Sequence, residues 1–160
     1  MAYERVESCD VMIIDEISMI SGDLLDKIDK IAKYIRNIDA PFGGIRVIIV
    51  GDFYQLPPIV DKKSCLYEYS FQSEVWRELN LRVHNLSETH RQKDDVFASM
   101  LNKIRIGAID DEVDMLIQEH EHNSEIDSEK SIKIRPTNNE VDRINERMLK
   151  FINYPEKIYD

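Results

Sequence analysis

Two short apolar runs, each stopped by polar residues, flank an amphipathic stretch in the first third of the chain. The runs are residues 11–14 (VMII) and 45–50 (IRVIIV), followed by Asp-Glu and Gly-Asp. Such runs are typical of strands buried on both faces of a parallel sheet. Between them, apolar residues recur at steps of three and four and predict a helix: Leu24, Leu25, Ile28, Ile31, Ile35 and Ile38. Strand, helix, strand is the pattern of a βαβ unit, so we predict an α/β fold with two parallel strands in one sheet.

The rest of the chain reads as mostly helical. The segment 52–70 contains Pro57-Pro58 and no helical period, so we expect a loop there. Periodicity and capping residues predict further helices over 71–79, 94–106, 111–121 and 139–152, with Ser21 capping the first helix and Gly107 just past the end of the 94–106 helix. Short strands are predicted at 81–86 and 132–134, and a polar connection at 119–130.

Composition narrows the class of protein. The 160 residues are 42% hydrophobic and 32% charged, an ordinary globular mixture that argues against a disordered or fibrous chain. The net charge is -10, and no lysine or arginine tract marks a nucleic-acid footprint. An acidic protein can still hold a locally basic channel, so nucleic acid is not excluded as a partner.

The cysteine content and the hydropathy of the sequence indicate the cellular compartment. Cys9 and Cys65 are too few for a disulfide framework and lack metal-ligand spacing, which favours a reducing compartment. No apolar run approaches the roughly 18 residues that span a bilayer, and the amino terminus is charged where a signal peptide is apolar. We expect a soluble, intracellular protein with no membrane partner, in the cytoplasm or the nucleus.

The acidic pair after the first strand suggests nucleotide hydrolysis. Nucleotide hydrolases end a buried strand with two carboxylates, one anchoring Mg²⁺ through water and one accepting the proton of the attacking water. Asp15 and Glu16 fit these roles in that order. The alternative is an acidic pair that merely ends a strand.

Two further polar residues could serve the same reaction. Gln55 follows the second strand, whose carboxyl end should share an edge with Asp15 and Glu16. Its amide can accept from water and donate to a phosphate, although a solvent-facing loop glutamine is the plain alternative. Arg91 precedes a helix and could neutralise charge on a transferred phosphoryl group, although a lone arginine is usually a surface residue.

Several motifs in one order resemble the Pif-one family of superfamily-one DNA helicases. The matching segments are VMIIDEISMI at 11–20, PFGGIRVIIVGDFYQLPPIV at 41–60, LSETHRQKDDVFASMLNKIRIG at 86–107 and RPTNNEVDRINERML at 135–149. GDFYQLPP is the most specific of them, and together they cover most of the chain.

The resemblance implies roles for these residues. Asp15 and Glu16 correspond to the Walker-B pair, Gln55 to the glutamine that contacts the γ-phosphate, and Arg91 to the arginine finger. It also implies ATP and Mg²⁺ as cofactors, single-stranded DNA or DNA junctions as partners, and genome maintenance through repair, recombination or telomere upkeep. Three residues beside Gln55 become weak candidates for the DNA side of the site: Phe53, Tyr54 and Pro58.

The sequence also departs from that family. None of its five glycines begins a G-x-x-x-x-G-K-[ST] phosphate cradle, and the later family motifs are absent. We therefore predict a partial P-loop-type RecA-like sheet in residues 1–87, followed by the mostly helical start of a second RecA-like domain in 88–160. Three hypotheses stay open for the 160 residues: half of an enzyme completed by a separate P-loop-bearing polypeptide, a degenerate remnant, or a DNA- or protein-binding module that acts with an intact helicase.

Three expectations follow for the 160-residue chain by itself. It should bind ATP-magnesium very weakly and not turn it over, because it has a base and a sensor but no cradle. Arg91 should not be held close to Glu16. The helix after Arg91 should expose apolar residues, Val96, Leu101 and Ile104 among them.

Overall fold

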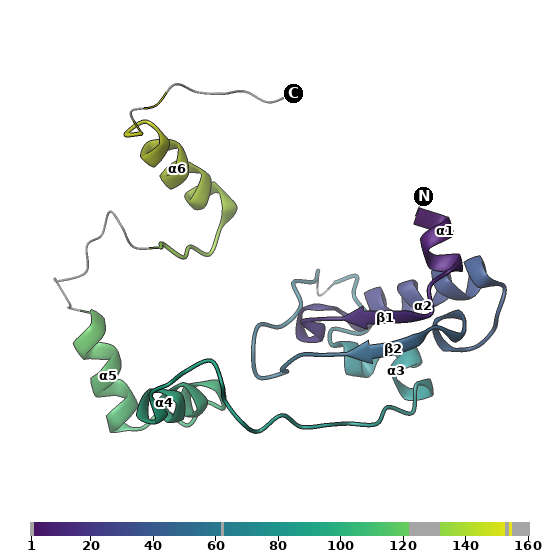
Figure 1. The fold of residues 1–160 in the computed structure, drawn as a ribbon, viewed down its shortest axis with the longest axis horizontal. Helices are drawn as coiled ribbons and strands as arrows, with labels where there is room; N and C mark the ends of the chain where they lie inside the picture. Colours follow the sequence, from purple (N-terminus) through teal and green to yellow (C-terminus); the bar gives the residue numbers. More distant parts are fainter. Residues whose placement is uncertain (1, 62, 122–131, 153, 155–160) are drawn as a thin grey trace. The chain divides into compact units, whose positions relative to one another are not determined.

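The computed structural model describes residues 2–61, 63–121, 132–152 and 154 (Figure 1). Contacts divide the chain into two compact units, residues 1–113 and 114–160. The boundary between motor-domain portions that the sequence predicts at residues 87 and 88 stays a prediction. The elements in chain order are α1 (Ala2–Glu7), β1 (Val11–Ile14), η1 (Ile17–Met19), α2 (Gly22–Arg36), η2 (Pro41–Gly44), β2 (Arg46–Ile49), η3 (Ser70–Gln72), α3 (Glu74–Glu78), α4 (Asp95–Arg105), α5 (Asp111–Glu121) and α6 (Asn138–Leu149).

The predicted βαβ unit is confirmed. β1 and β2 are parallel neighbours, with Val11 opposite Arg46 and Ile14 opposite Ile49, and α2 connects them. Figure 1 shows the two arrows side by side with α2 behind them. Because both strands run the same way, their carboxyl ends lie at one edge of the sheet.

The hydrophobic core lies between one face of this sheet and the helices. Alternate strand residues, Ile14 and partly buried Met12 from β1 and Val47 and Ile49 from β2, pack toward Leu25, Ala32, Phe42 and Val75. Leu25, Phe42 and Val75 are almost completely buried. Full burial of such a side chain contributes roughly 1.5–3 kcal/mol, so this cluster fixes how α2 and α3 sit against the strands.

Carboxylates of α2 accept backbone hydrogen bonds that attach the helix to neighbouring segments. Ser21 caps the helix as predicted, accepting the Leu24 N–H at 3.2 Å, while Asn37 ends it in a left-handed conformation. Asp26 accepts the N–H groups of Glu74 and Val75 at the start of α3. Asp29, also buried, accepts the Phe42 N–H at 2.6 Å. Because α2 ends at Arg36, Ile38 lies beyond the helix. Leu24 and Ile31 are exposed, since Asp26 and Asp29 take the inward-facing positions.

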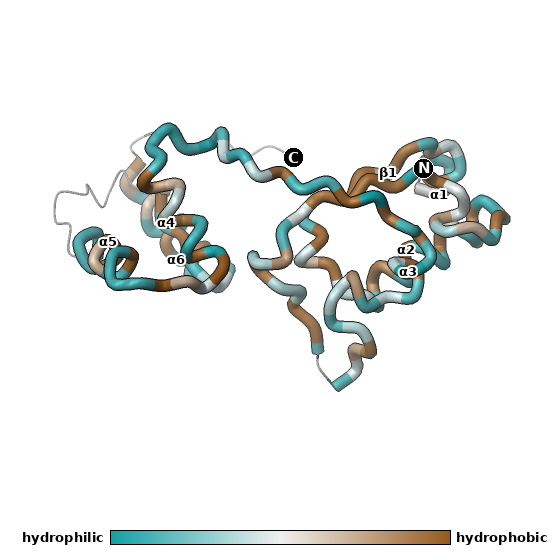
Figure 2. Tube along the Cα trace, turned by 90° about the horizontal axis from the view of Figure 1, so that it is seen from below, coloured by the Kyte–Doolittle hydropathy of each residue, from teal (hydrophilic) through white to brown (hydrophobic). Residues whose placement is uncertain are grey.

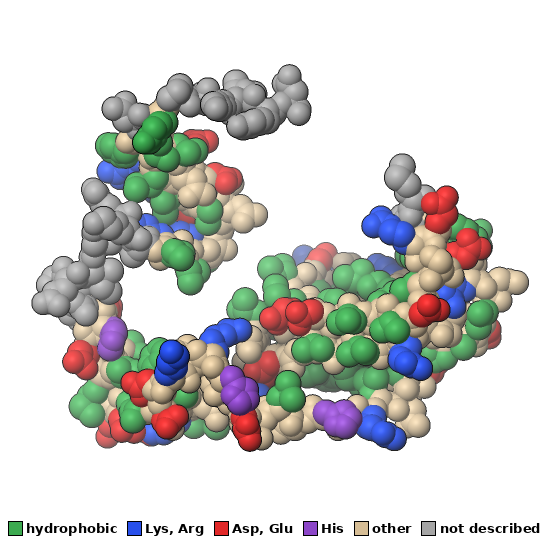
Figure 3. Space-filling model, viewed as in Figure 1, with side chains coloured by type: hydrophobic (Ala, Val, Ile, Leu, Met, Phe, Trp, Pro, Cys, Tyr) green, Lys and Arg blue, Asp and Glu red, His purple; other side chains and the backbone are tan. Residues whose placement is uncertain are grey.

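The second face of the sheet is uncovered in the described residues, so the prediction of strands buried on both faces was wrong. Val11 is 43% exposed, Ile13 67% and Ile48 45%. Figure 2 shows the tube brown along β1, and Figure 3 shows apolar side chains gathered over the two strands on this face. The sequence pattern is that of a doubly covered sheet, whereas helices pack on one side only.

Two predicted strands are absent from the structure. Residues 81–86 and 132–134 have no regular secondary structure, and Val83, Leu86, Ile132 and Ile134 are each more than four-fifths exposed. An alternating apolar pattern becomes a strand only when a partner edge accepts its backbone hydrogen bonds. No described residue pairs with the backbone of either segment.

The later helices were largely predicted. α4 begins after Asp94, whose carboxylate accepts the Val96 and Phe97 N–H groups, and Gly107 follows its end with φ +73°. α5 matches its predicted range, α6 ends three residues early, and the predicted 71–79 helix is split into η3 and α3. Exposure of Val96, Leu101 and Ile104 is confirmed. α1 was not predicted. Most of the predicted connection at 119–130 lies outside the described residues.

None of the described helices combines the length and the hydropathy that crossing a bilayer requires.

Candidate nucleotide site

The two polar motifs meet at the carboxyl edge of the sheet. Asp15 and Glu16 follow β1, and Gly51 and Asp52 follow β2 one residue beyond its end. The Val50 N–H donates to the Ile14 carbonyl at 2.9 Å, and the Ile17 N–H donates to the Val50 carbonyl at 3.1 Å. These bonds continue the ladder past the strands and hold both motif segments together, as the sequence predicted.

Gly51 allows this close approach. A Cβ at this position would lie 2.8 Å from Cγ2 of Ile17 and 2.9 Å from its backbone nitrogen. Both distances are too short for real atoms, and the nitrogen belongs to backbone that cannot turn aside. The absence of a side chain at residue 51 therefore lets the turn after Glu16 lie against the start of the Gln55 loop.

Glu16 adopts an uncommon backbone conformation. Its φ and ψ are 52° and 46°, the left-handed region that costs an L-residue about 1–2 kcal/mol. Its N–H donates to Oδ1 of Asp15 at 2.9 Å, and both carboxylates are exposed at the sheet edge. Strained residues of this kind concentrate at functional sites, where the surrounding structure holds them.

Gln55 is attached to Asp52 by two hydrogen bonds. Its backbone N–H donates to the Asp52 carbonyl at 3.0 Å, and Nε2 donates to Oδ2 of Asp52 at 3.0 Å. Within the described residues Oε1 accepts no hydrogen bond, which leaves it to accept one from water. Gln55 therefore lies in a short turn that begins at the same sheet edge as Glu16.

The Asp52 carboxylate accepts several hydrogen bonds in this turn, and its main partner, Arg105, was not predicted from the sequence. Arg105, at the end of α4, donates from Nη2 to Oδ1 of Asp52 at 3.0 Å and from Nε to Oδ2 at 2.5 Å. The Tyr54 N–H also donates to Oδ1. The Arg105 hydrogen bonds, with those of Tyr54 and Gln55, lower the pKa of Asp52 from 3.8 to about 2. Because the pair is 53 positions apart in the sequence, no local pattern could have revealed it.

The other predicted residues lie beyond the strand ends. Arg91 is exposed in the irregular segment between α3 and α4, so its role as a finger stays a prediction. Phe53 packs edge-on against Phe71 and Trp76, with ring centroids 5.0 and 6.0 Å away. Tyr54 is 65% exposed and Pro58 is buried. The assignment of Phe53, Tyr54 and Pro58 to a DNA side stays a prediction as well.

The carboxylates fit Mg²⁺ only together with a nucleotide. Among the described residues, no cluster of three acidic, histidine or cysteine side chains could hold a metal ion. Mg²⁺ in phosphoryl-transfer sites is commonly held by one or two carboxylates, waters and the phosphates of the substrate. The exposed Asp15 carboxylate at the strand end offers such a ligand.

A buried hydroxyl beside the acidic pair has no hydrogen-bond partner in the part of the chain that the structure describes. Ser18 is 2% exposed, and its Oγ forms no hydrogen bond within the described residues. Ser70, equally buried, donates from Oγ to the Ile17 carbonyl at 3.3 Å. An unpaired buried hydroxyl lowers stability, so removing the Ser18 hydroxyl should not destabilise the fold.

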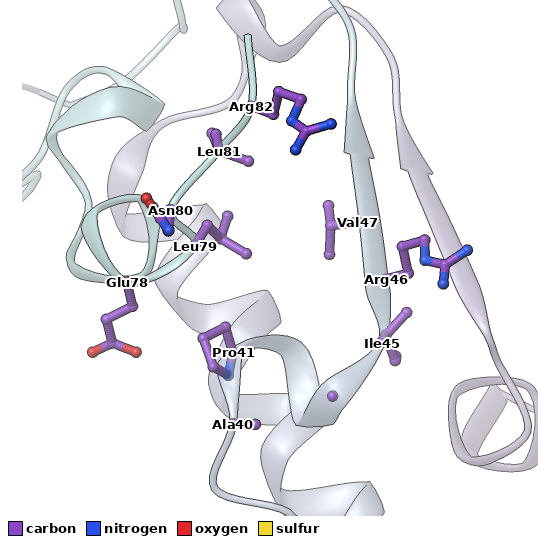
Figure 4. Close-up of a pocket in the computed structure, with 11 residues that line it drawn as sticks. Ala40, Pro41, Ile45, Arg46, Val47, Glu78, Leu79, Asn80, Leu81 and Arg82 are labelled. Carbon is purple, nitrogen blue, oxygen red and sulfur yellow. The ribbon is translucent and has the colours of Figure 1, made fainter.

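The outer edge of β2 also has no partner strand among the described residues. Arg46 and Val50 donate their N–H groups toward β1, so the backbone groups of Val47 and Ile49 face away from it. A pocket of about 390 Å³ lies on this side, lined by Pro41, Ile45, Val47, Leu79, Leu81 and Arg82 among others. Figure 4 shows Leu79 and Leu81 facing Val47 across the open space.

A family model described as PIF1-like helicase matches residues 1–115. The chain belongs to the PIF1-like helicase family. The ATP-dependent DNA helicase PIF1 of Xenopus laevis is 39% identical over 143 residues, which cover 89% of this chain and 22% of that protein. The ATP-dependent DNA helicase RRM3 of Saccharomyces cerevisiae is 44% identical over 100 residues, covering 62% and 14%. The chain thus spans about a fifth or less of these relatives.

Solved PIF1-like helicases share the fold. The crystal structure of the Candida albicans Pif1 helicase matches with a TM-score of 0.77 and 36% identity, over 96% of this chain and 35% of that one. A Bacteroides Pif1 helicase in complex with ADP-AlF3 and single-stranded DNA matches with a TM-score of 0.72 and 27% identity, over 96% and 38%. The RecA-like α/β fold class is thereby confirmed for a partial domain.

Proposed function

We propose that this chain contributes the hydrolytic half of an ATP-driven DNA helicase site, coupling ATP hydrolysis to DNA unwinding in genome maintenance. The observation that carries the proposal is the convergence of Asp15, Glu16 and the Gln55 turn at one sheet edge, linked by the Ile17 to Val50 hydrogen bond of 3.1 Å. Nothing in the packing of the two strands requires two carboxylates and an amide at this edge.

Each residue has a distinct task. Glu16 accepts the proton of the attacking water, and Gln55 uses Oε1 to orient that water. Asp15 would hold Mg²⁺ through bound water, and the ion would supply positive charge to the phosphate oxygens. Arg91 offers its guanidinium to the charge that develops on the γ-phosphate.

The phosphate cradle must come from another segment. The 160 residues contain no P-loop, and the β- and γ-phosphates take most of their ligands from that loop and its lysine. Two features support a strand-bearing segment beside β2: the outward backbone groups of Val47 and Ile49, and the pocket between β2 and Leu81. We propose that a P-loop strand, in the same polypeptide or a separate one, pairs with this edge.

The partners of the complete site include DNA. The Bacteroides Pif1 relative is described with single-stranded DNA, and a second matching structure concerns unwinding at forked double-stranded DNA by two coordinating Pif1 helicases, at 28% identity. We propose single-stranded or forked DNA as the substrate here too. The tyrosine and phenylalanine of the Gln55 turn remain the candidates for contacts with bases.

The test starts with the 160-residue chain alone. We expect ATP-magnesium binding too weak to saturate at millimolar nucleotide, and no phosphate release with or without single-stranded DNA. DNA-stimulated release that Glu16→Gln abolishes would show that the chain needs no external cradle. A second measurement follows amide exchange at Val47 and Ile49 when a P-loop-bearing segment of a PIF1-like helicase is added. Protection of both amides supports strand pairing, and unchanged exchange contradicts it.

A further inference from the structure

Arg105 makes a two-pronged contact with the turn that carries Gln55. Its Nη2 and Nε bind the two carboxylate oxygens of Asp52, the fork geometry in which a guanidinium holds a carboxylate most rigidly. Its Cζ also lies 5.0 Å from the centroid of the Tyr54 ring. Nη1 donates to Oδ1 of Asn102, one turn earlier in α4, at 3.4 Å. A side chain of α4 itself therefore helps to orient the Arg105 guanidinium toward the turn.

The same carboxylate holds Gln55. Oδ2 of Asp52 accepts from both Nε of Arg105 and Nε2 of Gln55, and Oδ1 accepts from the Tyr54 N–H. The Asp52 side chain is only 18% exposed, so water competes weakly for these bonds. On the other side of the turn, Phe53 is fixed against Phe71 and Trp76. Arg105 holds the turn on one side, and the ring contacts of Phe53 hold it on the other.

We propose that Arg105 is a positioning residue that acts through Asp52: it fixes the side chain of Gln55 and ties the Gln55 turn to α4, the helix that follows Arg91. This inference rests on the proposed function of Gln55 and adds a residue to it. Without Arg105, Asp52 is free to turn toward solvent and Gln55 loses its orientation. The link also makes α4 a mechanical connection between the sensor turn and the segment of the candidate finger.

The test uses the intact 160-residue chain and needs no nucleotide. The side-chain amide protons of Gln55 are followed by NMR, assigned with Gln55→Ala, and their exchange with water is measured. We expect Arg105→Gln to speed this exchange about fivefold, the effect of losing the orientation that one ordinary hydrogen bond provides. Arg105→Lys keeps the charge but not the fork, so it should give an intermediate rate.

Lys103→Gln is the matched control. Lys103 lies on the same helix and forms ion pairs with Asp110 and Glu112, but it does not contact the turn. It should loosen the start of α5 and leave the Gln55 protons unchanged. Equal effects of Lys103→Gln and Arg105→Gln would mean that α4 is merely destabilised, which overturns the proposal.

A double variant tests the path through Asp52. Arg105→Gln added to Asp52→Asn should change Gln55 no further, whereas an additional change would show that Arg105 acts by another route and contradict the proposal. If Arg105→Gln fails to fold, Arg105→Lys still decides, because unchanged Gln55 exchange in that variant would overturn the need for the fork. These readouts do not depend on ATP, so a failure of the helicase proposal would be seen separately, as absent hydrolysis in a completed site.

Discussion

The backbone N–H of Ile17 donates to the carbonyl of Val50 at 3.1 Å, which joins the residue after Glu16 to the residue before Gly51. This single bond extends the β1–β2 pairing beyond the strands themselves. Because of it, the carboxylates and the Gln55 turn belong to one rigid edge rather than to two independent loops.

The close approach behind that bond predicts the effect of Gly51→Ala. The added methyl would meet the Ile17 backbone nitrogen at 2.9 Å, so we expect a loss of about 1–3 kcal/mol in the free energy of unfolding, measured by urea titration. Gly107→Ala is the comparison, since no atom lies within 4 Å of its added carbon and only its left-handed φ of +73° is penalised, by about 1 kcal/mol. A cost for Gly51→Ala no larger than that of Gly107→Ala would contradict the contact.

Because the Glu16 backbone is left-handed, we expect glycine to be more stable than alanine at this position. Glu16→Gly and Glu16→Ala both remove the carboxylate, but only glycine relaxes at φ 52°, so the glycine variant should be more stable by about 0.5–1 kcal/mol. Lys30, exposed in the middle of α2, is the matched site, where glycine should be less stable than alanine by about 1 kcal/mol. The same order at both positions in thermal unfolding would show that Glu16 is not strained.

The two buried serines beside the acidic pair should respond in opposite directions. Ser18→Ala removes a hydroxyl without a partner in the described residues, so stability should stay unchanged or rise by up to about 1 kcal/mol. Ser70→Ala removes the donor to the Ile17 carbonyl and should cost about 1 kcal/mol. Unfolding midpoints in urea compare the two, and a destabilising Ser18→Ala would reveal a partner for its hydroxyl.

Asp52 predicts a specific loss of stability in acid. Hydrogen bonds from Arg105, the largest cause, and from Tyr54 and Gln55 lower the pKa of Asp52 from 3.8 to about 2, so the folded chain binds this proton less readily than the unfolded chain. The resulting stabilisation is complete above about pH 4 and is lost as the pH falls toward about 2. The ¹³C chemical shift of the Asp52 carboxyl should titrate near pH 2 in the parent chain and closer to its ordinary value in Arg105→Gln. Titration near 3.8 in the parent chain would argue against the ion pair.

Local patterns were enough for the parts of the fold that local chemistry decides. The apolar runs that became β1 and β2, the Ser21 cap of α2 and Gly107 after α4 were each readable because neighbouring residues carry the signal. The Asp15 and Glu16 pair and Gln55 followed from the rule that parallel strands end at one edge. These predictions needed no knowledge of long-range contacts.

Features that depend on distant partners could not be predicted in this way. Residues 81–86 have a strand-like pattern but pair with no strand among the described residues. The short helix α1 is held at its end by Arg36, which donates to the carbonyls of Glu7 and Cys9 from 27 or more residues away. The Asp52–Arg105 pair is of the same kind, since a bond between distant residues leaves no periodic trace in the sequence.

The central claim is that the 160 residues supply the carboxylates and the glutamine of a hydrolytic site whose phosphate cradle comes from another segment. The most direct measurement is the rate of DNA-stimulated phosphate release by the chain joined, ahead of residue 1, to the P-loop-bearing segment of a PIF1-like helicase. The account predicts turnover in the joined protein, none in either part alone, and its abolition by Glu16→Gln. Urea unfolding of each variant is the control for stability. Turnover that survives Glu16→Gln, or its absence in a joined protein that binds ATP and is folded, would contradict it.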